Sequence, residues 1–550
     1  MANWLPYAGA FLGTAALTRV PSRLRLSRAK HPSLAGHVRM AQRIAAFIPE
    51  HHYGADEWLT LDGASPAIAE QRQAGFARLS EQFRSREKTL ALTATTRAHL
   101  SDLQFTARYR VPFPFSRIVR EALPVGAFVA ESDGPRVRDL DGNELLDLTG
   151  SYGVNLFGYE FYKQIIAEGS RSVAGLGPVL GQYHPLVADT VARLVARTGL
   201  DEVSFHMSGT EAVMQAVRLA QYHTGRGRIV RFAGAYHGWW GDVQPGIGNP
   251  IPADRTLTLA ELSDRTLGVL ARSRDVACVL VNPLQALHPN RPAPSDGQLV
   301  DGVRHAGVDR AGYAEWLQRL ADVCRANGIV FILDEVFTGF RLAPGGAAEY
   351  FGVEPDLVTY GKTLGGGLPI GVLCGRGALM RRFRDDRPAD ICFARGTFNA
   401  HPYVVGTANA FLARLDAPEL RTLYDGMEER WLVRAALLNA RLAERGLPVR
   451  VATLGTIWTV TYEQPGRYHW LLQFYLRAAG LALSWVGTGR IIFSLDYDDA
   501  RFAEVVTRFV TGAQAMADDG WWWQSGETPR QIRRSLLATA VRTRLGWHSR

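Results

Sequence analysis

Residues 328–336 of the chain read GIVFILDEV, and residues 360–369 read YGKTLGGGLP. An apolar run that ends in two acids is typical of a buried strand with polar side chains at its carboxyl end. Asp334 is costly to bury at that point unless it meets a cation. In the second stretch Lys362 lies among apolar residues and glycines, with no acid nearby in the sequence. This setting favours a desolvated, nucleophilic amine, and an ordinary lysine on a surface loop is the alternative.

Short apolar runs alternate with helical patterns between about residues 200 and 400. Strands are predicted at residues 203–206, 229–232, 277–281 and 329–333. This rhythm predicts βαβ units and a mostly parallel sheet that binds ligands at the carboxyl ends of its strands. Residues 136–143 predict a hairpin that turns at Asp-Gly, and residues 490–494 predict a short strand in a smaller α+β domain. The predicted fold class is therefore α/β.

Other candidate ligand-binding residues follow the predicted strands. Ser208, Gly209 and Thr210 open a helix, where small hydroxyl residues and free N–H groups suit a phosphate; a plain N-cap is the alternative. Tyr236 follows the strand at residues 229–232 and could stack on a flat heterocycle or pack in the core. Together with Lys362 and Asp334, these residues indicate a ligand that carries a phosphate, a ring with a basic nitrogen and a carbonyl that reacts with amines. Pyridoxal 5′-phosphate supplies all three: Lys362 would form the Schiff base and Asp334 would hold the pyridinium.

Composition limits the class of protein and its partners. The 550 residues are 47% hydrophobic and 21% charged, enough for two or three packed domains and unlike a disordered chain. Residues 1–49 and 530–550 contain no acid and hold thirteen Lys and Arg residues, more than the net charge of +9. The body between them is therefore net negative, which argues against nucleic acid as a partner. Four cysteines without a CxxC pair predict no metal site and a cytoplasmic location.

The two ends of the chain carry separate expectations. Residues 4–17 are apolar but shorter than the roughly 20 residues that span a membrane. The next apolar stripe predicts a helix that packs on its own domain, and a membrane-surface helix is the alternative. The stripe comprises Leu34, Val38, Ala41, Ala45 and Ile48, and the polar residues on the opposite face are Arg39, Gln42 and Arg43. Peripheral membrane contact through the N-terminal segment is a related hypothesis. Residues 521–523, WWW, predict a packing or partner contact.

Several motifs occur in the order found in one enzyme family: SGTEA at 208–212, TGR at 224–226, YHG at 236–238, DEV at 334–336, GK at 361–362 and GT at 396–397. Over roughly residues 115–515 the chain resembles the class III (fold type I) PLP-dependent aminotransferases, most closely the glutamate-1-semialdehyde aminomutase branch. The resemblance implies that Gly209 and Thr210 contact the phosphate and that Tyr236 stacks on the ring. His237 of the same motif is a further cofactor-binding candidate.

The same resemblance implies that Asp334 pairs with the ring nitrogen and that Lys362 carries the cofactor. It also implies that Thr397 reaches the phosphate of the other subunit's cofactor, in a homodimer with active sites at the interface. By this resemblance the chain divides into a basic, helical extension at 1–100, the first part of a small domain at 101–160, a large cofactor-binding domain at 161–410, the rest of the small domain at 411–525 and a basic tail at 526–550.

Departures from the family pattern bear on the substrate. Asn282 stands where family members usually have Glu, and Leu287 stands near the position of a further acid in glutamate users. The missing acid near Leu287 disfavours exchange of glutamate with 2-oxoglutarate. Phe337 replaces a common Gln, and residues 290–308 look longer than the aminomutase branch needs. The chain also resembles aminotransferase domains of hybrid polyketide–peptide synthases, which act on carrier-bound 3-oxoacyl chains.

We therefore expect transfer of an amino group from a small-molecule or carrier-bound donor to a carbonyl acceptor, with a 3-oxoacyl or lipid-like acceptor as one candidate. An aminomutase, racemase or decarboxylase could use the same residues. A catalytically degenerate scaffold is the remaining alternative.

Overall fold

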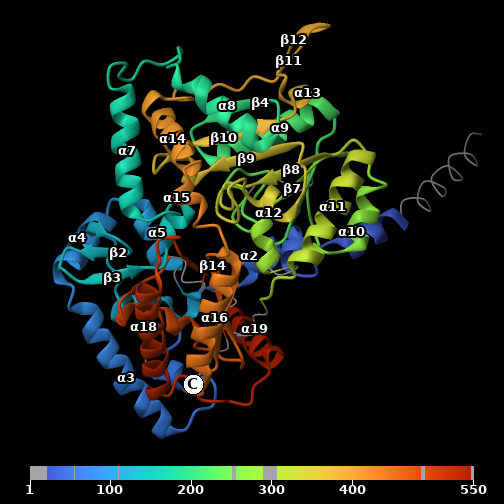
Figure 1. The fold of residues 1–550 in the computed structure, drawn as a ribbon. Helices are drawn as coiled ribbons and strands as arrows, with labels where there is room; N and C mark the ends of the chain where they lie inside the picture. Colours follow the sequence, from blue (N-terminus) through green and yellow to red (C-terminus); the bar gives the residue numbers. More distant parts are fainter. Residues whose placement is uncertain are drawn as a thin grey trace, which may run out of the picture.

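The computed structural model describes residues 21–54, 56–109, 111–249, 255–288, 306–484 and 490–546. These residues form two lobes, with the large central sheet in the upper lobe of Figure 1 and two smaller sheets in the lower lobe. Residues 4–17, and the part of the predicted long loop at 290–305, lie outside the described residues. Within the described ranges, none of the helices combines the length and the apolar character that a membrane crossing requires.

The large lobe is built on a seven-stranded sheet in the order β4-β10-β9-β8-β7-β5-β6. Its strands are β4 (Glu202–His206), β5 (Arg228–Phe232), β6 (Thr256–Leu259), β7 (Val276–Val281), β8 (Val330–Asp334), β9 (Leu357–Gly361) and β10 (Gly371–Gly375). β10 pairs antiparallel with both β4 and β9, and the pairs from β9 to β6 are parallel. The prediction of a mostly parallel α/β sheet is confirmed.

Both faces of this sheet are covered by helices. Along β8, Val330 and Ile332 join the hydrophobic cluster under α9 (Gly209–Thr224), whereas Phe331 and Leu333 join the cluster that contains the buried face of α11 (Arg310–Ala326). Successive residues of a strand point to opposite faces, so an uninterrupted apolar run is what a sheet covered on both sides requires. The other helices of this lobe are α7 (Tyr159–Val173), α8 (Leu186–Thr198), α10 (Asp264–Leu270), α12 (Ala347–Phe351), α13 (Gly377–Met380) and α14 (Pro402–Leu415).

The smaller lobe combines two antiparallel-rich sheets with long helices. One sheet has the order β1 (Val129–Asp133), β2 (Arg136–Asp139), β3 (Glu144–Asp147), β15 (Leu481–Ala482), and the other the order β13 (Val449–Leu454), β14 (Ile457–Tyr462), β16 (Arg490–Ile492). The helices are α15 (Pro418–Arg421), α16 (Met427–Glu444), α17 (Leu472–Ala478) and α18 (Asp499–Asp518). The hairpin predicted at residues 136–143 is confirmed by β2 and β3, with Gly142 in the turn at φ 86°. A further hairpin, β11 (Phe383–Arg384) and β12 (Arg387–Ile391), projects from the top of Figure 1.

The N-terminal region is mainly helical. It contains α2 (Val38–Phe47), α3 (Pro66–Arg84), α4 (Glu87–Arg97), α5 (Ser101–Tyr109) and α6 (Ser116–Ala122), and the C-terminal tail forms α19 (Pro529–Arg544). Short 3₁₀ helices occur at Leu34–Gly36, Glu57–Thr60, Phe113–Phe115, Gly150–Gly153, Pro283–Leu287, Lys362–Gly365 and His469–Leu471. The domain boundaries proposed from the sequence stay a prediction.

The helix observed in this region, α2, differs from the helix predicted over residues 34–48. It begins at Val38, because Ser33 caps a separate 3₁₀ turn at Leu34–Gly36. Gln42, predicted opposite the apolar stripe, is half-buried, and its side-chain amide donates to the carbonyl oxygens of Gly246 and Asn249. Ala41 is buried, in agreement with the expectation that this helix packs on its own chain.

Candidate active site

The predicted site residues lie at one edge of the central sheet. Asp334 ends β8, Lys362 follows β9, and Asn282 follows β7. Ser208 follows β4 and Tyr236 follows β5. Because these strands run in the same direction, their carboxyl ends meet at the same edge. There they line one cavity of about 850 Å³.

Lys362 occupies an unusual backbone position at this cavity. Its φ is 45°, in the left-handed region that side chains other than glycine seldom adopt. Such conformations cost free energy and cluster at functional sites. Desolvation lowers the pKa of the Lys362 ammonium, the Asp334 carboxylate opposes this shift, and the Arg341 guanidinium adds to it. Nζ lies 5.6 Å from the centroid of the Phe337 ring.

Asp334 is held by three donors. Its Oδ2 lies 2.7 Å from Nδ1 of His237, and its Oδ1 accepts from the Val336 amide and from Oγ1 of Thr359, both at 3.1 Å. A carboxylate has about four lone-pair positions, so these bonds leave capacity for one further donor. Asp334 and His237 are both almost fully buried, so the carboxylate is oriented before any ligand arrives.

The second acid of the pair has a different place. Glu335 does not line the cavity; its carboxylate accepts from the backbone amides of Ala347 and Ala348 at the start of α12. Burial raises the pKa of Glu335 to about 7. The alternation of side chains along an extended segment therefore separates the two neighbouring carboxylates.

The N-terminus of α9 forms another wall. Ser208 is the N-cap, and its Oγ accepts from the Glu211 amide at 3.3 Å. The first amides of a helix have no acceptor within it, and here Gly209 and Thr210 stand at the cavity. A Cβ on Gly209 would come within 2.5 Å of Val336 Cγ1, so only glycine lets α9 approach this closely.

Tyr236 and His237 complete the predicted set from the loop after β5. The Tyr236 side chain is 57% exposed and lines the cavity. Asn282 is buried below it and donates from Nδ2 to the Tyr236 carbonyl oxygen at 3.2 Å. The residue that departs from the family's Glu thus supports the loop that carries Tyr236.

Thr397 is the exception. It is exposed in the loop between β12 and α14 and does not line this cavity. The structure therefore brings together Ser208, Gly209, Thr210, Tyr236, His237, Asp334 and Lys362, but not Thr397. Its expected contact with another subunit's cofactor stays a prediction.

Sequence reasoning missed the wall contributed by the smaller lobe. Tyr152, with φ 58°, Ser484 and Arg490 line the cavity, as does Trp239 from the large lobe. No sequence motif marks these positions. Phe337 stood out only as a departure from the family pattern, and it lies in the wall beside Lys362.

Arg341 joins the two lobes behind this wall. The buried guanidinium donates to the carbonyl oxygens of Gly153, Asn155 and Phe493 and to Oγ1 of Thr456, at 2.8–3.1 Å. Burial lowers the pKa of Arg341 to about 10. These bonds position the loop that carries Tyr152.

Comparison with known proteins agrees with this geometry. The model of the family "Aminotransferase class-III" matches residues 118–511. The glutamate-1-semialdehyde 2,1-aminomutase of Nitratidesulfovibrio vulgaris Miyazaki F is 32% identical over 382 residues, which are 65% of this chain and 83% of that protein. A solved transaminase with PLP bound is 27% identical with a TM-score of 0.59, covering 72% of this chain and 92% of that one.

A glutamate-1-semialdehyde aminomutase structure from Pseudomonas aeruginosa PAO1 shares the fold, with 20% identity and a TM-score of 0.65 over 82% of this chain and 99% of the other. Members of the matched family are typically dimers that act on small molecules. The chain therefore belongs to the class-III aminotransferases, which are fold type I transaminases that depend on pyridoxal 5′-phosphate.

Proposed function

We propose that this transaminase binds its cofactor through Lys362, Asp334 and the N-terminus of α9, and aminates a carbonyl acceptor that carries an apolar chain. One observation carries the proposal: the Lys362 amine and the Asp334 carboxylate line the same cavity as the first residues of α9. The cavity therefore contains a covalent anchor, a partner for a ring nitrogen and a phosphate site.

The residues present fit pyridoxal 5′-phosphate. The amides of Gly209 and Thr210, at the positive end of the helix dipole, suit its phosphate. The free capacity of the Asp334 carboxylate suits its protonated ring nitrogen, and Tyr236 suits a face of the ring. When bound, this cofactor supplies an aldehyde that reacts with amines and a ring that withdraws electrons.

The chain's own groups have separate tasks in this proposal. Lys362 holds the cofactor and, once released, its Nζ moves the proton at the reacting carbon, for which a lowered pKa is an advantage. Asp334 keeps the ring nitrogen protonated, with His237 and Thr359 holding the carboxylate in place. The apolar wall around Phe337 excludes water and so strengthens these interactions.

The lining supports an apolar acceptor. Trp239, Leu284, Phe337 and Leu368 contribute large apolar side chains to the cavity. A 3-oxoacyl or lipid-like chain, free or carrier-bound, matches such walls better than a dicarboxylate does.

An aminomutase is the second candidate, because the curated relative with 32% identity is a glutamate-1-semialdehyde 2,1-aminomutase. Incubation with glutamate-1-semialdehyde alone separates the two. An aminomutase forms 5-aminolevulinate without a second substrate, whereas the proposed transaminase needs a donor and an acceptor.

The proposed anchor is tested with Lys362→Ala and a matched control, Lys163→Ala, in which an exposed lysine beside Glu160 is lost. After borohydride reduction, we expect mass spectrometry to find the cofactor covalently attached to the peptide that contains Lys362 in the wild type and in the control. The Lys362→Ala protein should show no such adduct and no turnover. Covalent attachment at another lysine contradicts the proposal.

The acceptor is tested with 3-oxoacids of increasing chain length. Each methylene that becomes buried should raise kcat/KM by about fourfold until the cavity is filled. Replacement of Trp239 by Ala should reduce this gain for long chains and leave short ones little changed. A kcat/KM that is independent of chain length would reject the apolar acceptor while leaving the cofactor site intact.

Dimer formation belongs to the same proposal. Thr397 is exposed and apart from its own chain's cavity, as expected of a residue that completes a second subunit's phosphate site. Mixing Thr397→Val protein with Lys362→Ala protein tests this, since a mixed dimer then has one site with both defects and one site with neither. Mixing should therefore restore activity. A cofactor affinity of Thr397→Val equal to that of the wild type would argue against the role.

A further inference from the structure

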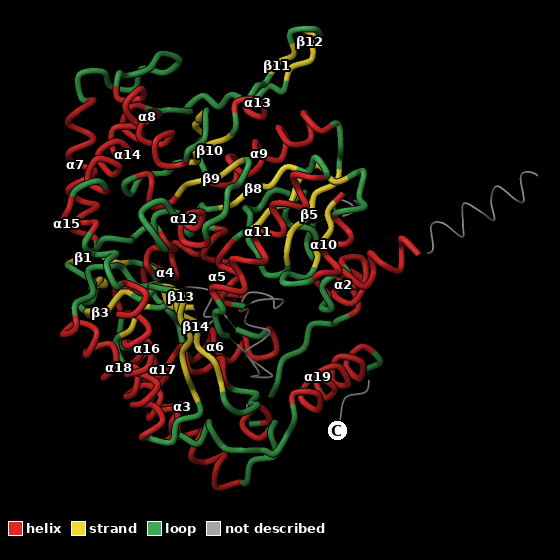
Figure 2. The backbone as a smooth tube through the Cα atoms, turned by 45° about the vertical axis from the view of Figure 1, so that its right-hand side comes forward, coloured by secondary structure: helices red, strands yellow, loops and turns green. Residues whose placement is uncertain are grey.

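The two acid-free ends of the chain lie side by side. The Arg544 guanidinium, at the end of α19, is 6.0 Å from the centroid of the Phe47 ring, at the end of α2. Figures 1 and 2 both show α19 next to α2. Residues 21–49 and 529–546 contain no Asp or Glu, so two basic segments almost 500 residues apart in sequence combine on one side of the molecule.

The outer face of α19 mixes arginine with apolar side chains. Arg530 and Arg534 are exposed, as are Leu537 and Leu545, at 57% and 55%. Ile532 and Ala540 are buried and attach the helix to the body of the protein. The apolar side chains on the outer face are therefore not needed for this packing.

The exposed side of α2 has the same character. Arg43 is exposed, and Met40 and Phe47 are 48% and 45% exposed. Ala41 is buried, and Gln42 anchors the helix to the carbonyl oxygens of Gly246 and Asn249. We call the exposed side chains of α2 and α19 the basic tail surface: Arg39, Met40, Arg43, Phe47, Arg530, Arg534, Leu537 and Arg544.

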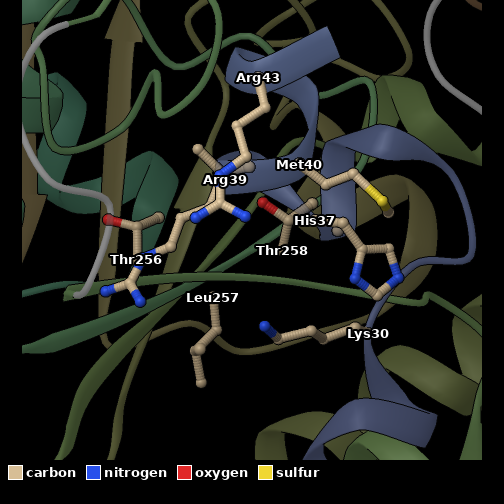
Figure 3. A pocket seen from close by; sticks show the side chains of 10 residues that line it. Lys30, His37, Arg39, Met40, Arg43, Thr256, Leu257 and Thr258 are labelled. Atoms are coloured by element: carbon tan, nitrogen blue, oxygen red, sulfur yellow. The ribbon is translucent and has the colours of Figure 1, made fainter.

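A cavity of about 510 Å³ opens beside α2, between this helix and strand β6. Lys30, Arg39 and Arg43 line it, and Figure 3 shows Arg43 on the side of β6 that carries Thr258 and Lys30 on the side that carries Leu257. Residues 30 and 31 are fixed there, because Lys30 bridges to Leu259 and the His31 amide donates to the Thr258 carbonyl oxygen. This preformed basic cavity suits a phosphate group.

We propose that the basic tail surface docks on an anionic lipid bilayer and that the cavity beside α2 receives a lipid headgroup phosphate. Helices that carry arginines together with exposed apolar side chains lie in the membrane interface, where the charges attract anionic lipids and the apolar groups enter the acyl boundary. A nucleic acid would use the arginines but give no reason for the exposed Met40, Phe47 and Leu537. This docking is independent of the proposed reaction, because none of these residues lines the active-site cavity.

The test is co-sedimentation of the full-length holoenzyme with vesicles. We expect binding to equimolar phosphatidylglycerol and phosphatidylcholine, weakened by salt, and little binding to phosphatidylcholine alone. Lys30→Gln with Arg43→Gln removes two charges from the cavity, and Arg530→Gln with Arg534→Gln removes two from α19. Each pair should weaken binding by about fivefold per charge.

The matched control is Arg171→Gln with Arg421→Gln. Both are exposed arginines, in α7 and α15, which Figure 2 places at the left edge of the molecule, with α2 and α19 on the right. The control should bind vesicles as the wild type does, and all three variants should keep wild-type turnover, which shows that they fold.

Three outcomes overturn the proposal. Equal losses in all three double variants would mean that net charge alone drives binding. If millimolar glycerol phosphate releases the protein from the vesicles, and the variants do not bind glycerol phosphate in the absence of lipid, the cavity is a site for small anions. A short DNA duplex that binds in the absence of lipid, with the same losses in the variants, would identify a nucleic-acid surface.

Discussion

Lys362 is one of four lysines in the chain, and its side chain lies against the Phe337 ring in a wall that disfavours charge. Asp334 offsets part of that effect, and the cationic Arg341 adds to it. At the scale of single residues, the pKa of Lys362 thus reflects a balance between desolvation, which lowers it, and one carboxylate, which raises it. That carboxylate is itself held by His237, Thr359 and the Val336 amide.

The lowered pKa of Lys362 predicts a pH-dependent stability of the cofactor-free chain. Between the lowered pKa and about 10.5, the unfolded chain binds the proton more tightly than the folded one, so a rising pH raises the free energy of unfolding. Relative to Lys362→Met, which cannot titrate, the wild type should gain stability between neutral pH and about pH 10. Urea denaturation of both proteins at the two pH values measures this gain in the free energy of unfolding. Parallel pH profiles of the two proteins would contradict the prediction.

Replacement of Asp334 by Asn should separate cofactor attachment from turnover. The amide keeps the size of the side chain but removes the negative charge that faces the ring nitrogen. We expect turnover to fall by a factor of at least about 10² to 10³, as when a preorganised charge partner is lost, while the cofactor remains attached to Lys362. Stopped-flow rates and the absorbance of the bound cofactor measure the two effects. His99→Gln, an exposed histidine outside the cavity, is the control.

At the scale of elements, β8 ends in two carboxylates that serve different partners. Asp334 faces the cavity, and Glu335 accepts from the Ala347 and Ala348 amides at the start of α12. The helix N-terminus favours an anion, but the burial of Glu335 opposes its ionisation. Burial is the stronger effect, because the pKa of Glu335 is raised to about 7.

Glu335→Gln should therefore change the pH dependence of stability with a defined sign. The folded chain binds the Glu335 proton more tightly than the unfolded chain between about pH 4.5 and 7. A rise in pH through this range should lower the free energy of unfolding of the wild type, relative to the variant, by about 3 kcal/mol. Denaturation at both ends of the range tests this. A wild type that gains stability relative to Glu335→Gln would show that the helix terminus outweighs burial.

At the scale of the whole molecule, helix α3 of the N-terminal region is part of the smaller lobe's core. Arg72 of α3 is fully buried, pairs with Asp62 and donates to the Leu59 and Gly520 carbonyl oxygens. Its guanidinium lies 4.7 Å from the Tyr468 ring centroid and 5.2 Å from that of Trp521. Trp521 in turn stacks on Trp58 at 5.1 Å, so at least one tryptophan of the WWW stretch serves packing.

Arg72→Ala should destabilise the protein strongly, because it leaves Asp62 buried without its partner. A loss of about 3–5 kcal/mol is expected from breaking a buried ion pair on one side. Arg84→Ala on the same helix is the control: it removes an exposed arginine that donates to the Glu121 carbonyl oxygen, and should cost about 1 kcal/mol or less. The denaturation midpoints of the two variants compare them directly. Equal losses would mean that the N-terminal helices add little to the stability of the lobe.

Local pattern was enough for four of the seven strands of the central sheet, β4, β5, β7 and β8, and for most of the candidate site. The uninterrupted apolar runs that became β5, β7 and β8 identify strands covered on both faces, since burial on both sides requires such runs. Because ligands of a parallel sheet bind at the carboxyl ends of its strands, Asp334 could be assigned to the site without coordinates. Lys362 was identified from its apolar, glycine-rich setting, and β9, the strand before it, was not predicted.

The sequence did not predict how distant segments pack against one another. The contact of Tyr152 and Arg490 with the cavity, the support of Tyr236 by Asn282 and the meeting of α2 with α19 each depend on how the lobes are joined. The short-range periodicity of a sequence reports which side of an element is buried, but not which remote element covers it. The sequence thus determined four strands of the central sheet, most of the candidate site and the family, whereas the tertiary structure alone decided the smaller lobe's wall and the contact between the two basic ends. The reason is that burial of an apolar face is specified locally, while the choice of partner for that face is made by the packing of the complete chain.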